Sequence, residues 1–126
     1  MCDHKVRDAS ILDTIKKMLG DDLMDTVFDV DIIVQINSAL FILRQVGLNI
    51  PDGFIVTGTE QTWKDLLGTN YNLEIIKSYI YLKTKLVFDP PASATVFNAY
   101  EKTIAEYEWR IEHETDALKN NIGGDT

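Results

Sequence analysis

Several ingredients of common protein classes are scarce in this sequence. Its 126 residues include one cysteine, Cys2, so it can form neither an internal disulfide nor a cysteine-rich metal site. No apolar run approaches the ~18–20 residues of a membrane span, and the polar N-terminus 1–5 lacks the apolar stretch of a signal peptide. We therefore expect an intracellular chain with no membrane contact.

Basic residues are also scarce, with 12 lysines and arginines against 20 aspartates and glutamates. This balance argues against general nucleic-acid binding, because neutralising phosphates requires clustered basic side chains. Residues 1–31 and 101–126 each carry a net charge of −4, whereas residues 32–100 are neutral. We expect a packed centre with acidic, solvated elements at both ends.

The length predicts a single domain, 1–126, and apolar residues recur at helical spacing in five segments. The first segment, 10–19, opens on the candidate capping pair Ser10 and Asp13. The second segment has Asp29 as its predicted cap and carries the most regular apolar stripe. Both segments are followed by a glycine that is expected to end the helix.

Three further helices are predicted in the second half of the chain. Thr59 is the expected cap of a short helix, and residues 73–88 are apolar on nearly every face, which is typical of a central helix. Ser93 caps the last helix, which we expect to run to about Leu118 before a flexible tail, 120–126. The predicted fold is an all-α, single-domain bundle of about five helices with a long C-terminal helix.

Catalytic and metal-binding motifs are each incomplete. Residues 53–58 have the glycine spacing of a P-loop, but Thr59 and Glu60 stand where lysine and a hydroxyl residue must reach phosphate and magnesium. His113 begins a zinc-protease pattern whose second histidine position is Ala117. We expect no catalytic residues, no metal, no cofactor and no enzyme activity.

The aromatic residues give the sequence its candidate interface. Tryptophans usually belong to a core or to a protein interface, and Trp109 lies off the apolar stripe of its helix, beside Arg110. An exposed Trp-Arg pair fits a partner contact, since both residue types are enriched at interface hot spots. The candidate interface residues in the body of the chain are Trp63, Tyr107, Trp109 and Arg110.

Seven short sequence segments follow one another along the chain in an order that is found in a known family. They are Asp31-Ile32-Ile33, Ile36-Asn37-Ser38-Ala39, Gln45-Val46-Gly47, Thr62-Trp63-Lys64-Asp65-Leu66-Leu67-Gly68, Lys77-Ser78-Tyr79-Ile80-Tyr81-Leu82-Lys83, Phe88-Asp89-Pro90-Pro91 and Glu108-Trp109-Arg110-Ile111. In this order they resemble the head–tail connector, or adaptor, proteins of tailed bacteriophages. The resemblance gives a matched core, 8–111, and a C-terminal extension, 112–126.

The resemblance implies a small structural protein of the virion neck, made in the cytoplasm of the host bacterium. Such a protein assembles with itself into a ring, usually of about twelve copies, beneath the portal protein. The ring extends the DNA channel, through which DNA passes without specific binding, and offers a docking surface to the tail or to a stopper or tail-completion protein. Chain ends in the family commonly reach the portal, which makes Leu118 and Ile122 candidate apolar anchors.

A second interpretation rests on the lysines of the central helix. Lys77, Lys83 and Lys85 form the only local concentration of basic residues, with two tyrosines between them. They leave open the alternative of a small helical DNA-binding or regulatory protein, whose DNA binding would weaken as salt rises.

Overall fold

The computed structural model describes residues 9–20, 26–67 and 73–124, with side chains described as far as His113. In chain order the elements are α2 (Ile11–Leu19), the 3-10 helix η2 (Thr26–Phe28), α3 (Asp29–Gln45), α4 (Trp63–Leu67), α5 (Leu73–Phe88) and α6 (Ala94–Gly124). Within the described ranges no strand forms, and one isolated β-bridge pairs Ser10 with Thr62. The prediction of an all-α fold is confirmed.

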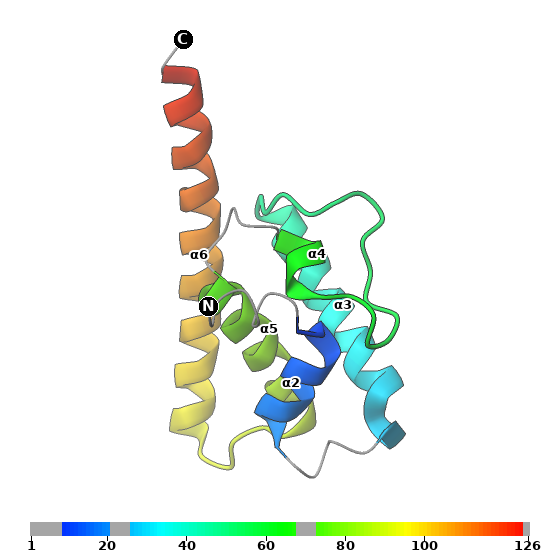
Figure 1. Ribbon diagram of the computed structural model, residues 1–126. Coiled ribbons are helices and arrows are strands. Elements are labelled where there is room, and N and C mark those ends of the chain that lie inside the picture. Colours follow the sequence, from blue (N-terminus) through cyan, green and yellow to red (C-terminus); the bar gives the residue numbers. More distant parts are fainter. Residues whose placement is uncertain (1–8, 21–25, 68–72, 125–126) are drawn as a thin grey trace.

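The centre of the bundle is α5, which packs against α2, α3 and α6 (Figure 1). Its bounds are those predicted from the sequence, because Leu73 opens the apolar stretch and the prolines after Asp89 end it. Burial also agrees, since the buried residues of α5 lie on several of its faces. The central position of this helix is confirmed.

The core is built from side chains of all five α-helices and of the loop between α3 and α4. Its fully buried members include Ile11, Ile36, Trp63, Tyr79 and Val56, the last from the loop. Asn37 of α3 holds this loop in place, because its side chain accepts a hydrogen bond from the Val56 amide (2.8 Å) and donates one to the Val56 carbonyl (3.0 Å). The segment without regular structure is thereby fixed to the bundle.

Ser10 caps α2 as predicted, with its hydroxyl accepting a hydrogen bond from the Asp13 amide at 3.2 Å. The prediction for α4 is wrong, because Thr62 caps it and Thr59 does not. The Thr62 hydroxyl accepts from the Asp65 amide (3.2 Å), and the Asp65 carboxylate accepts from the Thr62 amide (3.1 Å). This reciprocal pair satisfies two amides at once, which Thr59 cannot do from three residues further upstream.

Asp29 does not cap α3, contrary to the prediction. It is the first residue of the helix, and the preceding residue, Phe28, makes no side-chain capping bond. The Asp29 carboxylate instead lies 2.7 Å from the ammonium group of Lys16 on α2, and the Lys16 side chain is only 5% exposed. A buried lysine requires an opposite charge, so Asp29 serves the α2–α3 contact and is not free to cap its own helix.

The last helix is longer than predicted. It continues past Leu118 to Gly124, through residues expected to form a tail. No proline interrupts this stretch, and the first strong helix breakers are Gly123 and Gly124. In Figure 1 α6 runs along α5 and then projects beyond the other helices.

Residues Thr26–Gln45, which comprise η2 and α3, form a helix long and apolar enough to cross a membrane by length and composition alone. The expectation that no segment reaches this length is therefore wrong. The core helix of a soluble protein passes the same test, and Ile32, Ile36 and Leu43 of α3 are buried in the bundle. The absence of membrane contact stays a prediction.

Candidate protein interface

The placement of α6 follows from one apolar stripe. Tyr100, Ile104, Tyr107 and Ile111 recur three or four residues apart and pack on the core. Ile104 and Ile111 are buried, whereas Tyr107 is half-buried and mainly contributes to this packing. The remaining faces of α6 are left to solvent.

Trp109 lies on one of these exposed faces, where 59% of its surface is accessible. The His113 ring stacks on the indole, with centroids 3.9 Å apart, and the His113 Nδ1 atom lies 2.8 Å from the Trp109 carbonyl oxygen. Arg110, also exposed, pairs with Glu106 at 2.8 Å. The aromatic ring and the guanidinium group are thus presented outward in defined positions, and their contact with a partner stays a prediction.

Trp63 is in the opposite situation. It has no exposed surface, its indole nitrogen donates to the Thr14 hydroxyl (3.1 Å), and its amide donates to the Ala9 carbonyl (3.2 Å). These contacts join the start of α4 to α2. From the sequence, Trp63 could belong either to the core or to an interface. The structure places it in the core, where it has no accessible surface for a partner to contact.

Two other predicted interface residues, Leu118 and Ile122, lie in the projecting turns of α6. Their side chains lie outside the described part of the chain. Their role as anchors remains a proposal.

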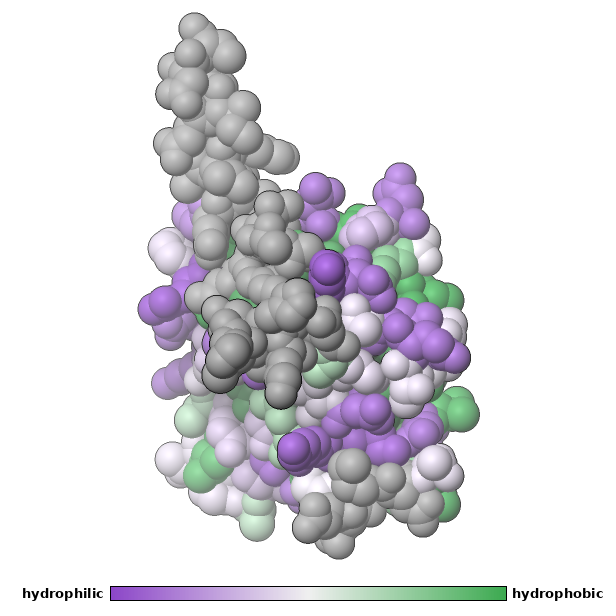
Figure 2. Space-filling model, in the orientation of Figure 1, coloured by the Kyte–Doolittle hydropathy of each residue, from purple (hydrophilic) through white to green (hydrophobic). Residues whose placement is uncertain are grey.

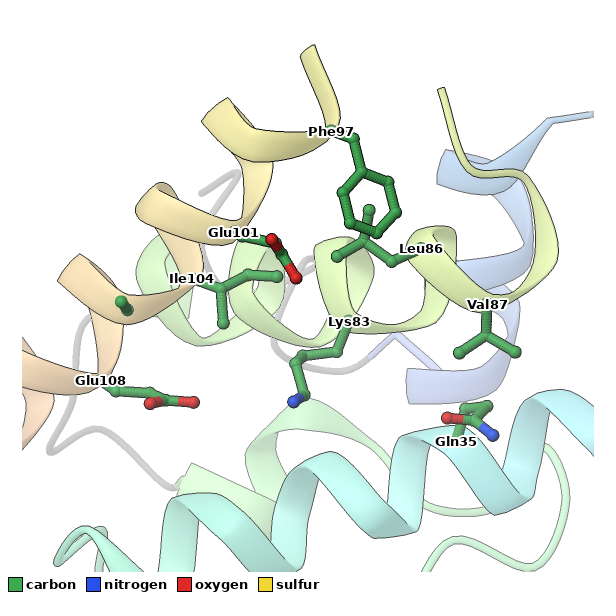
Figure 3. A pocket seen from close by; sticks show the side chains of 9 residues that line it. Gln35, Lys83, Leu86, Val87, Phe97, Glu101, Ile104 and Glu108 are labelled. Atoms are coloured by element: carbon green, nitrogen blue, oxygen red, sulfur yellow. The ribbon is translucent and has the colours of Figure 1, made fainter. Parts of the chain in front are cut away.

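A hollow of about 450 Å³ lies between α3, α5 and α6 (Figure 3). Its apolar lining includes Leu86 and Val87 of α5 and Phe97, Ile104 and Ala105 of α6. Lys83 extends into it from α5, Gln35 borders it from α3, and Glu101 and Glu108 face it from α6. No sequence motif marks this hollow, because it exists only where three helices from distant parts of the chain meet.

A partly buried hydrogen bond braces one wall of the hollow. The Tyr79 hydroxyl donates to the Glu108 carboxylate at 2.7 Å. Burial and this hydrogen bond raise the pKa of Tyr79 well above its ordinary value. The neutral hydroxyl therefore fixes Glu108 of α6 to α5 at the edge of the hollow.

The lysines of α5 do not form a single basic face. Lys77 pairs with Glu74 at 3.3 Å, and Lys85 pairs with Asp89 at 3.0 Å, a hydrogen bond that raises the pKa of Lys85. Lys83 points into the hollow beside carboxylates. Because two of the three are neutralised locally, the arrangement gives little support to DNA binding.

Other large apolar side chains are exposed on α3 and at its start. Val27, Val30, Val34 and Phe41 are 53–72% exposed and recur at helical spacing on the side away from the core. In Figure 2, hydrophobic side chains show at the right edge, over α3 and the loop beside it, and at the lower left, over the start of α6. A helix that is apolar on opposite faces indicates a surface that a partner covers.

Among the described residues, no three His, Cys, Asp or Glu side chains gather so as to hold a metal ion. The features that stand out are surfaces and a hollow suited to protein contacts.

Comparison with known proteins gives one family. No curated protein and no solved structure matches the chain. The family model described as "Phage connector protein" matches residues 11–117, which extends beyond Ile111, the limit of the resemblance noted in the sequence. Since the match covers most of the 126 residues, the chain belongs to the phage connector proteins, structural proteins of the junction between the virion head and tail.

Proposed function

We propose that this protein forms a ring, of about twelve copies, that docks on the portal protein and extends the DNA channel toward the tail or a stopper protein. The observation that carries the proposal is the family match over residues 11–117. A connector between head and tail must contact other virion proteins on two sides, and it must leave a passage for DNA.

The exposed apolar surfaces support an assembled state. Val30 and Val34 on α3 and Trp109 on α6 are each more than half exposed. Contiguous apolar surface is uncommon on a protein that works alone, and contacts between subunits cover it. Part of the stability of the protein would then come from assembly.

The acidic balance supports a channel that does not hold DNA. The net charge of −8 at neutral pH lies in residues 1–31 and 101–126, and these parts of the chain repel phosphates. Acidic residues of the ring that face the passage would keep DNA mobile.

The C-terminal part of α6 is our candidate for the portal contact, because it projects beyond the bundle (Figure 1). Deleting residues 112–126 keeps Ile111, the last described core residue, and should leave a folded protein. We expect the truncated protein to bind the portal more weakly. Unchanged binding would reject this role for the extension.

The test of the proposed function is the mass of the purified protein, alone and mixed with its portal ring, by light scattering on a sizing column. We expect co-elution at about twelve copies per portal ring. A protein that stays monomeric and ignores the portal would overturn the proposal. In that case a DNA titration at several salt concentrations would test the alternative of a DNA-binding protein.

A further inference from the structure

Trp109 and its neighbours on α6 form a compact projection, which we call the knob and define as Trp109, Arg110 and His113. The indole is 59% exposed, and the stacked imidazole, 3.9 Å away, restricts its orientation. The guanidinium group of Arg110 lies beside it, 2.8 Å from Glu106 of the same helix in an exposed pair that costs little to exchange for another carboxylate. An ordered aromatic ring next to a cation is the kind of anchor that fills a pocket at interface hot spots.

The hollow between α3, α5 and α6 has the complementary properties. Its volume of about 450 Å³ suits one large side chain with part of its helix, and its floor is apolar. Glu101 and Glu108 supply negative charge for an arginine. Lys83 is half-buried at the hollow and can lie against the face of an incoming indole.

The knob of one molecule cannot reach its own hollow. Successive helical residues turn by about 100°, so Trp109 lies roughly 80° and Arg110 roughly 180° around α6 from Glu101. The knob and the hollow therefore face different directions on the same helix. Two different, complementary patches are what a ring requires, because each subunit must contact one neighbour with one patch and the next with the other.

We propose that the knob of one copy inserts into the hollow of a second copy, with Arg110 facing Glu101 and Glu108. This inference rests on the proposed ring and assigns its subunit contact. The occupant of the hollow is a second copy of this chain, because the knob matches the hollow in charge and size and faces away from the hollow of its own molecule.

Two variants separate the two halves of the contact. Trp109→Ala removes the knob and keeps the hollow, whereas Ala105→Trp fills the hollow from an exposed position of α6 and keeps the knob. Each variant alone should self-associate at least about tenfold more weakly than the wild type. An equimolar mixture should form a dimer of twice 14.3 kDa, because one intact knob then meets one intact hollow. Light scattering gives these masses.

Ile55→Ala is the matched control, since Ile55, in the loop between α3 and α4, is exposed to nearly the same extent as Trp109, 55% against 59%, and belongs neither to the two patches nor to the exposed apolar face of α3. It should assemble like the wild type. A second measurement reverses the charges: Arg110→Glu should block assembly, and adding Glu101→Arg should restore it. Circular dichroism confirms that each variant is folded.

The inference is overturned if both variants assemble like the wild type, or if their mixture yields no dimer. If the wild type associates only on the portal, the same variants are compared there by the number of copies bound per portal ring. Normal rings from both variants would reject the knob and hollow and leave the proposed function intact. A wild type that neither associates nor binds the portal would reject the proposed function as well.

Discussion

The two tryptophans of this chain occupy opposite environments. Trp63 at the start of α4 is fully buried and hydrogen-bonded to Thr14, whereas Trp109 on α6 is 59% exposed and stacked on His113. The first closes the core between two helices, and the second adds nothing to that core. A residue type that sequence reasoning treats as one class therefore serves stability in one region and recognition in the other.

Among the variants that test this difference between the buried and the exposed tryptophan, Trp63→Ala is expected to lower the stability of the fold most. Removing a buried indole leaves a cavity and takes away the hydrogen bond that the Thr14 hydroxyl accepts from the indole nitrogen, while the bond from this hydroxyl to the Ser10 carbonyl stays. The free energy of unfolding should fall by about 3–5 kcal/mol. Urea unfolding followed by circular dichroism measures this loss. A change below about 1 kcal/mol would show that Trp63 is not the core residue described here.

A smaller loss is expected from Asn37→Ala, which releases the loop before α4 from α3. The buried amide and carbonyl of Val56 lose both side-chain partners, at a cost of about 1–3 kcal/mol. Urea unfolding measures it, with Ser38→Ala, an exposed neighbour, as the matched control. Equal stability of the two variants would contradict the role of Asn37.

Tyr79→Phe tests the tie between the core and α6 and is expected to cost about 1 kcal/mol at neutral pH. Because the folded-state pKa of Tyr79 is raised above its ordinary value of 10.0, the unfolded chain loses this proton first as pH rises. The stabilisation is therefore complete below pH 10 and is lost as pH rises further. Unfolding in urea at about pH 9 and about pH 11 should show a steeper loss for the wild type than for the variant. Parallel losses would contradict the assignment.

The smallest effect on stability is expected from Trp109→Ala, within about 0.5 kcal/mol of the wild type, because the side chain is exposed. Thermal unfolding of dilute protein, where assembly does not contribute, measures it. A loss as large as that of Trp63→Ala would place Trp109 in the core and remove it as a surface contact.

The sequence was sufficient to predict the features for which the local pattern and the packing of the fold agree. The bounds of α5 follow from a continuous apolar stretch ended by prolines, and the exposure of Trp109 follows from its position off the apolar stripe of α6. The sequence was insufficient to predict the role of a side chain that depends on a residue far away along the chain. The sequence around Asp29 predicts a helix cap, but in the structure its carboxylate pairs with the ammonium group of Lys16 on α2.

The hollow is the clearest case of information that a linear pattern lacks. Lys83, Glu101 and Gln35 come from three helices, and nothing in their spacing places them together. Packing alone creates the hollow, so no motif could have predicted it. The length of α6 was underestimated for a different reason, since weak helix formers such as Asn120 and Asn121 do not end a helix as a proline does.

The most direct test is the accessibility of Trp109 before and after assembly. Trp63→Phe leaves Trp109 as the only tryptophan, so its fluorescence quenching by acrylamide reports on α6 alone. We expect strong quenching in the dilute free protein and protection in the assembled ring. Equal quenching in both states would contradict the claim that this exposed face of α6 is where the subunits meet.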